Sequence, residues 1–115
     1  MGIQSLSEEV LLIELPREPQ TTGELDLTTR LINSKTSRHV IVDFSAVEIM
    51  PSGTIGSLMM LKRAAGSIDH QLVLCSVSAG IQAIFRRVGL QALFQFATDK
   101  LAAIEMLDRE TPART

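Results

Sequence analysis

The hydroxyl of Ser52 is the side-chain group in this sequence that is best placed for chemistry. It lies in the segment Pro51-Ser52-Gly53-Thr54, at the expected boundary between a strand and a helix. One interpretation is that Ser52 caps the helix by accepting a backbone hydrogen bond, a role that contributes about 1 kcal/mol. The other is that Ser52 also accepts a phosphoryl group, because a phosphate there would meet free amides and the positive end of the helix. Residue types alone favour the capping role.

The other polar residues form no recognisable catalytic or metal-binding pattern. His39 and His70 lack partners at the spacing of a metal site or a catalytic triad, so we expect structural or solvated roles. The carboxylate pairs are Glu8-Glu9, near the N-terminus, and Glu24 with Asp26, expected on the first turn of a helix where they offset its dipole. No glycine-rich phosphate-binding motif occurs. The sequence therefore predicts neither a cofactor nor a metal.

Length and composition indicate one small domain with an aliphatic core. The chain has 115 residues, 45% of them hydrophobic, with four Phe and neither Tyr nor Trp. A chain of this length accommodates a single domain. Eleven basic residues are outnumbered by thirteen acidic ones, and few aromatic rings are available for base stacking, so nucleic-acid binding is disfavoured.

The sequence also predicts a cytoplasmic protein without direct membrane insertion. Mean hydropathy is +0.22, yet no stretch approaches the roughly 18 to 20 apolar residues that a spanning helix needs. Residues Met1 to Glu9 lack a basic segment followed by an apolar one, so we expect no secretion signal. The lone Cys75 ends the apolar run Leu72–Cys75, where a small buried side chain is expected, and a reducing compartment fits.

Strand and helix patterns alternate along the first half of the chain. The apolar run Val10–Leu15 predicts a strand, which Pro16 closes. Thr21 or Thr22 is expected to cap a helix with a leucine-rich stripe. The β-branched run His39–Phe44 predicts the central strand, covered on both faces.

The second half contains three further helix patterns. One runs from about Gly53 to Ala65. A second begins after Ser78 and ends at Gly89, with apolar residues at i, i+3, i+4 and i+7. Thr98 is expected to cap the last helix. The apolar positions of the last two helices are Ile81, Ile84, Phe85 and Val88, and Leu101, Ile104 and Leu107.

These elements predict an α/β fold. Leu72–Cys75 and Ala92–Phe96 are the remaining expected strands. Strands that alternate with helices over short connections imply a mixed, mostly parallel sheet, here of four or five strands with about four helices. We expect a single domain over residues 1–108 and a frayed polar tail over residues 109–115.

From about Val10 to Leu107 the chain resembles a STAS domain, the module of anti-sigma-factor antagonists and of the tails of sulfate transporters. The segment Val40–Val47 resembles the family's apolar strand that ends in Asp-Leu-Ser-Gly-Val. The segment Met50–Gly56 lies where the family has an apolar residue followed by Asp-Ser-Ser/Thr-Gly-Leu-Gly. The segment Val88–Phe94 resembles the family's Thr-Gly-Leu-Asp-x-Leu-Phe.

The resemblance implies a phosphorylation switch. In the family's antagonists, an anti-sigma factor that is also a kinase phosphorylates the serine after the aspartate. The unphosphorylated antagonist binds this partner and frees a sigma factor, whereas the phosphorylated form releases the partner. Ser52 matches the acceptor serine, with Thr54 as a lesser candidate. The chain departs from the motif at Pro51, which replaces the aspartate, at Gly53 and at Thr54.

The partner is expected to contact the turn and the outer side of the helix that follows it. Met59 and Met60 are adjacent, so both cannot point inward, and methionine suits an adaptable binding surface. We expect Lys62-Arg63 and Arg86-Arg87 to be solvated. The predicted partner-binding residues are Met50, Pro51, Ser52, Gly53, Thr54, Gly56, Ser57 and Met60.

Three hypotheses about function follow. The first is a non-enzymatic regulatory module that binds an anti-sigma factor with serine kinase activity and is switched at Ser52. The second, favoured by Pro51, is a non-phosphorylated STAS adaptor subunit of a transporter or of a larger signalling complex. The third is a small enzyme with Ser52 or Cys75 as nucleophile, although neither has a recognisable base nearby in sequence. Oligomeric state is left open.

Overall fold

The computed structural model describes residues 2–6, 10–16, 39–65 and 72–110. Several expectations lie outside these residues: the helix beginning at Thr21 or Thr22, and the side chains of Glu8, Glu9, Glu24, Asp26 and His70. The expected polar tail over residues 109–115 is also outside them, apart from residues 109 and 110, which are the last two residues of a helix. The described part contains five strands, three α-helices and a short 3₁₀ helix. No helix in this part of the chain has both the length and the hydrophobicity that a membrane crossing requires.

The five strands form one mixed sheet in the order β1-β2-β3-β4-β5. They are β1 (Gly2–Ser5), β2 (Val10–Glu14), β3 (His39–Asp43), β4 (Leu72–Cys75) and β5 (Gln95–Ala97). β1 is antiparallel to β2, and all other neighbouring pairs are parallel. The predicted central strand is confirmed, since every residue of β3 is buried. The edge strand β1 was not predicted.

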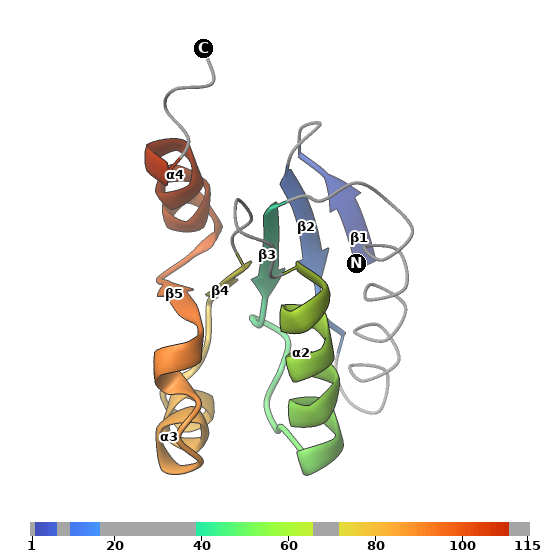
Figure 1. The fold of residues 1–115 in the computed structure, drawn as a ribbon, viewed down its shortest axis with the longest axis vertical. Coiled ribbons are helices and arrows are strands. Elements are labelled where there is room, and N and C mark those ends of the chain that lie inside the picture. Colours follow the sequence, from blue (N-terminus) through green and yellow to red (C-terminus); the bar gives the residue numbers. More distant parts are fainter. Residues whose placement is uncertain (1, 7–9, 17–38, 66–71, 111–115) are drawn as a thin grey trace.

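Helices cover both faces of the sheet. On one face lie α2 (Ser52–Ala65) and α3 (Ala79–Arg87), whose apolar side chains join the larger core cluster. On the other lies α4 (Lys100–Glu110), which contributes Ala103 and Leu107 to a smaller cluster. Figure 1 shows the chain leaving the lower end of β3 and returning upward as α2. The loop between them therefore lies at the carboxyl end of the central strand.

All four phenylalanines gather in the larger cluster. The ring of Phe85 on α3 contacts those of Phe44, Phe94 and Phe96 edge-on, with centroid distances of 6.4, 5.6 and 5.4 Å. Edge-to-face contacts suit the charge distribution of aromatic rings. The few aromatic residues of the chain are thus concentrated around one fully buried ring.

Both ends of α3 agree with the sequence. The Ser78 hydroxyl accepts a hydrogen bond from the Ile81 amide at 3.2 Å, which confirms the predicted cap. Gly89 adopts a φ of +79°, a backbone conformation that favours glycine. The amides of Gly89 and Leu90 donate to the carbonyls of Arg86 and Phe85, the paired bonds of a Schellman motif.

Three expectations near the C-terminus were wrong. Residues 91–93 form the 3₁₀ helix η1, and only Gln95–Ala97 is a strand. The last helix is capped by Asp99 rather than Thr98: its carboxylate accepts from the Ala102 amide at 2.9 Å and compensates the helix dipole. Leu101 is 72% exposed because it precedes the inward-facing Ala103 by about 200° of rotation.

Candidate functional site

The loop between β3 and α2 is fastened by three apolar side chains. Phe44, Val47 and Met50 are buried, at intervals of three residues. The Phe44 amide donates to the carbonyl of Cys75 at 3.0 Å, and the Val47 amide donates to the Phe44 carbonyl at 2.9 Å. These contacts hold the loop against the sheet and leave the residues between the anchors exposed.

Helix α2 begins one residue earlier than expected. The Pro51 carbonyl accepts from the amides of Thr54 and Ile55, at 3.0 and 3.3 Å. Pro51 therefore takes the capping position, and Ser52, predicted to be the cap, is the first helical residue. The absence of an amide hydrogen on proline is harmless there, because a helix start has surplus donors.

Ser52 and Thr54 have opposite environments. Ser52 is exposed, and its hydroxyl has no hydrogen-bond partner among the residues that the structure describes. Thr54 is fully buried, so an enzyme could reach its hydroxyl only if the start of the helix moved. The first turn of α2 contains no acidic residue, so its positive end is not compensated from within the helix.

The predicted partner-binding residues separate into two groups. The exposed group can contact a partner, and its members are Pro51, Ser52, Gly53, Gly56 and Met60. The other group is buried, which corrects the assignment of its side chains as contact residues. Its members are Met50, Thr54 and Ser57.

Sequence reasoning missed Ile49, which is 60% exposed beside the turn. It lies between the anchors Val47 and Met50, so the spacing of the anchors was the signal that could have identified it. A large exposed apolar side chain beside Ser52 extends the surface available for protein contact.

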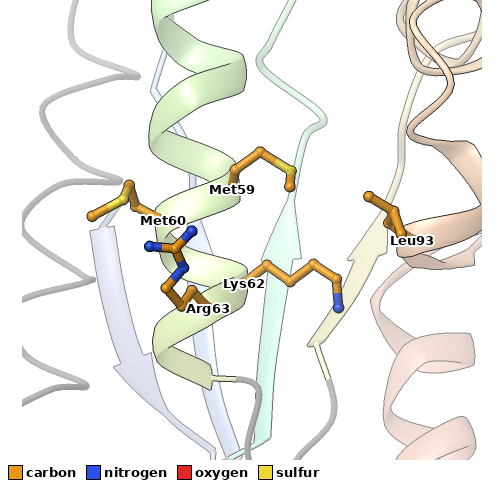
Figure 2. Close-up of a pocket in the computed structure, with 5 residues that line it drawn as sticks. All are labelled: Met59, Met60, Lys62, Arg63 and Leu93. Atoms are coloured by element: carbon orange, nitrogen blue, oxygen red, sulfur yellow. The ribbon is translucent and has the colours of Figure 1, made fainter.

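The outer side of α2 contributes a second surface feature. Met59 is half-buried and Met60 is 52% exposed, which confirms that only one of the pair points inward. Both line an open groove with Lys62, Arg63 and Leu93 (Figure 2). Sequence reasoning treated the two basic residues as solvated and did not place Leu93 near α2.

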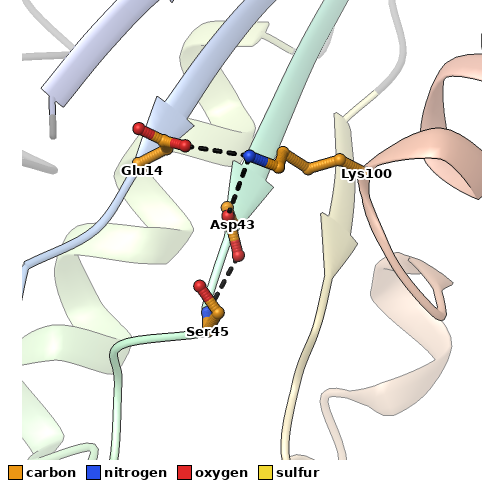
Figure 3. A network of polar contacts seen from close by, with 4 residues as sticks. All are labelled: Glu14, Asp43, Ser45 and Lys100. Atoms are coloured by element: carbon orange, nitrogen blue, oxygen red, sulfur yellow. Dashed lines mark hydrogen bonds and ion pairs between the residues drawn. The ribbon is translucent and has the colours of Figure 1, made fainter.

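A polar network lies at the carboxyl ends of β2 and β3 (Figure 3). The Lys100 ammonium is 3.0 Å from a carboxylate oxygen of Glu14 and 3.9 Å from one of Asp43. The other Asp43 oxygen accepts from the Ser45 amide at 2.9 Å. The hydrogen bond with Lys100 lowers the pKa of Glu14 and raises that of Lys100. Asp43 thereby connects the beginning of the loop to the start of α4.

Cys75 and His39 are both buried, as the structural interpretation predicts. Burial, together with the negative charge of Asp43, raises the pKa of the Cys75 thiol to about 11. Thiolate is the nucleophilic form, so the environment of Cys75 suppresses its reactivity. Within the described residues, no group of three or more His, Cys, Asp or Glu side chains could hold a metal ion.

Comparison with known proteins gives matches in sequence and in fold. A family model described as STAS domain matches residues 19–103. An anti-sigma-factor antagonist (STAS) domain protein from Planctomyces limnophilus superimposes with a TM-score of 0.79 and 18% identity, covering 93% of this chain and 98% of that one. A variant of RsbS from Moorella thermoacetica gives a TM-score of 0.80 at 15% identity, with coverage of 99% and 97%. The anti-sigma factor antagonist SpoIIAA in its unphosphorylated form gives 0.70 at 15% identity, with coverage of 94% for both chains.

Proposed function

Because this chain belongs to the STAS domain family, we propose that it is a regulatory protein-interaction module of the anti-sigma-factor antagonist type. Its partner is an anti-sigma factor with serine kinase activity, which binds the exposed surface at the start of α2. The observation that carries the proposal is the exposed Ser52 at the first position of a helix whose first turn has no acidic residue. The similar SpoIIAA, described in an unphosphorylated form, supports it.

Phosphorylation of Ser52 acts by changing charge at the interface. The Ser52 oxygen attacks the terminal phosphorus of the kinase-bound nucleoside triphosphate, the diphosphate leaves, and a base of the kinase takes the hydroxyl proton. The product carries close to two additional negative charges. The helix end tolerates them, whereas a partner packed against Ser52 and Ile49 must desolvate them. The phosphorylated protein therefore dissociates from its partner.

Phosphopeptide mapping and affinity capture test this switch. The tagged protein is isolated from its native cell, and its partners are compared with those of Ser52→Ala and Ser52→Asp. We expect phosphate on Ser52, retention of the partner by Ser52→Ala, and its loss from Ser52→Asp. Ser45→Ala and Ser45→Asp are matched controls, because Ser45 is an exposed serine in the loop that precedes Ser52. The absence of phosphate, with the same partners for all variants, would exclude the switch.

A second candidate function is that of a non-phosphorylated STAS adaptor. Pro51 favours it, because this residue fills the capping position of α2 without the carboxylate that the family's phosphorylated motif carries. The adaptor binds one partner constitutively, as a subunit of a transporter or of a larger signalling complex. Capture of a transporter ATPase, equally by the wild type and Ser52→Asp, would select this function.

We further propose that the protein acts in the cytoplasm and has no catalytic activity of its own. Burial and the raised pKa of Cys75 argue against a nucleophilic thiol. An enzyme would instead require Ser52 as its nucleophile. Labelling of Ser52 by a serine-directed probe, together with loss of a measurable turnover, would contradict the proposal.

A further inference from the structure

The groove on the outer side of α2 is formed by side chains from two separate elements, α2 and η1. It has a volume of about 450 Å³ and is lined by Met59, Met60, Lys62, Arg63 and Leu93. Figure 2 shows Met59 and Lys62 extending from α2 toward Leu93, which comes from η1. Met60 and Leu93 remain 52% and 45% exposed. The groove therefore presents apolar surface that the described part of the chain does not cover.

Two cations accompany this apolar surface. Neither Lys62 nor Arg63 forms an ion pair with any residue that the structure describes. The Lys62 ammonium lies over the ring of Phe94, 5.8 Å from its centroid. This cation–π contact restrains a long side chain before any ligand arrives, so less conformational entropy is lost on binding. The charged and apolar parts of the groove are thus in place before a partner binds.

We propose that the groove is a docking site for an acidic amphipathic helix of a protein partner. Apolar side chains of that helix pack on Met59, Met60 and Leu93, and its carboxylates pair with Lys62 and Arg63. Such a helix binds through its apolar residues at positions i, i+3, i+4 and i+7, and methionine side chains adapt to its shape. Charge complementarity selects the acidic partner.

The openness of the groove favours a peptide over a small molecule. Met60, Arg63 and Leu93 are exposed lining residues, whereas small-molecule sites bury most of their ligand. Figure 2 shows Met60 extending to the side of α2 away from Leu93, so a helix laid across the outer side of α2 would contact both. Anionic lipid also combines negative charge with apolar groups, and binding to vesicles distinguishes it from an acidic peptide.

This docking site goes beyond the switch at Ser52 and does not depend on it. Lys62 follows Ser52 by ten residues of α2, which corresponds to about 15 Å along the helix axis. A partner in the groove therefore contacts a part of α2 that shares only Met60 with the partner surface expected around Ser52. The two sites can fail or succeed separately.

The test is an NMR titration of the full-length, ¹⁵N-labelled protein with a designed peptide. The peptide forms an amphipathic helix with leucines on one face and glutamates beside them, and a second peptide has glutamine at each glutamate. We expect the acidic peptide to shift the amides of the groove residues, and the neutral peptide to bind about tenfold more weakly.

Charge reversal assigns the binding to the groove. The double variant Lys62→Glu/Arg63→Glu is expected to reduce affinity for the acidic peptide at least about tenfold. The matched control is Arg86→Glu/Arg87→Glu, which reverses an adjacent basic pair exposed at the end of α3. We expect this control to stay within about twofold of the wild type, which corresponds to less than half a kcal/mol.

Four outcomes would overturn the proposal. They are undetectable binding of the acidic peptide, equal binding of the neutral peptide, equal losses in the groove and control variants, and shifts confined to other surfaces. Sedimentation with phosphatidylglycerol vesicles, without binding of the peptide, would assign the groove to a membrane surface instead. A switch at Ser52 that proves absent leaves each of these results interpretable.

Discussion

Glu14, Asp43 and Cys75 stand side by side in the register of three adjacent parallel strands. Strand residues alternate between faces, so these three share the face covered by α4. Two carboxylates in neighbouring positions repel each other unless a cation intervenes. Lys100 supplies that cation from the first residue of α4. Lys100 thus reduces the repulsion between the two carboxylates at the end of the sheet that α4 covers.

This ion pair predicts a pH dependence of stability. The pKa of Glu14 is lowered from its ordinary value of 4.5 by Lys100. The carboxylate is therefore favoured in the folded state, and its contribution is fully present above pH 4.5 and lost as the pH falls through the lower folded value. Glu14→Gln is expected to be less stable than the wild type near pH 7, and the two are expected to converge in acid.

Urea unfolding of both proteins between about pH 7 and pH 3 measures this difference. High salt should reduce it at neutral pH, because the pair is partly exposed. Glu105→Gln changes an exposed acidic residue on α4 and serves as the control. If the difference in free energy of unfolding between the wild type and Glu14→Gln increased in acid, the stabilising role of the Glu14 carboxylate would be contradicted.

Cys75 predicts slow reaction with thiol reagents. The difference between a pKa of about 11 and the ordinary 9.0 lowers the thiolate fraction roughly 100-fold at pH 8. Complete burial adds steric protection. Iodoacetamide should therefore alkylate the native protein at least about 100-fold more slowly than the urea-unfolded protein, as followed by intact mass. Ser45→Cys in a Cys75→Ala background is the exposed control, and equally slow labelling of that variant would refute the explanation.

At the scale of elements, the two serines that precede or begin helices make different contributions. Ser78 accepts a hydrogen bond from the Ile81 amide, whereas the Ser52 hydroxyl has no partner in the described structure. Ser78→Ala should lower the free energy of unfolding by about 1 kcal/mol. Ser52→Ala should change it by less than about 0.5 kcal/mol. Urea denaturation distinguishes them, and equal losses would mean that Ser52 also acts as a cap.

The elements that were predicted correctly carry local signals. Ser78 and Gly89 mark both ends of α3 within one short segment, and the β-branched run beginning at His39 identifies the buried central strand. The edge strand β1 is four residues long, and it is defined by antiparallel pairing with β2. The strand propensity of four residues cannot reveal the strand with which they pair.

The candidate site was only partly predictable for a similar reason. The turn at Ser52 follows from strand and helix signals on either side, so its position at the sheet's carboxyl end could be expected. The capping role of Pro51 depends on the direction of one carbonyl, which residue type does not determine. The groove requires Leu93 to lie near α2, whose lining residues are 30 to 34 positions earlier in the sequence, and only tertiary packing brings them together.

At the scale of the whole molecule, Phe85 connects the loop, the groove and the core. Its ring contacts Phe44, the first anchor of the loop, and Phe94, over which Lys62 lies. A side chain this central has no nearby space into which the structure can collapse when it is removed. The stability of both surface features therefore depends on one buried ring.

Truncation of Phe85 is accordingly expected to be the most damaging single change considered for this protein. Phe85→Ala should lower the free energy of unfolding by about 3–5 kcal/mol, a large part of the roughly 5–15 kcal/mol available to a small domain. Leu101→Ala also truncates a large apolar residue, but at a site that is 72% exposed, and should change stability by less than about 0.5 kcal/mol. Phe85→Leu keeps more of the side-chain volume, so it separates loss of packing from failure to fold.

Urea unfolding of the three variants is expected to order them as Leu101→Ala, Phe85→Leu and Phe85→Ala, from least to most destabilised. A Phe85→Ala protein as stable as Leu101→Ala would show that the core does not depend on this ring, and that the loop and the groove are held independently.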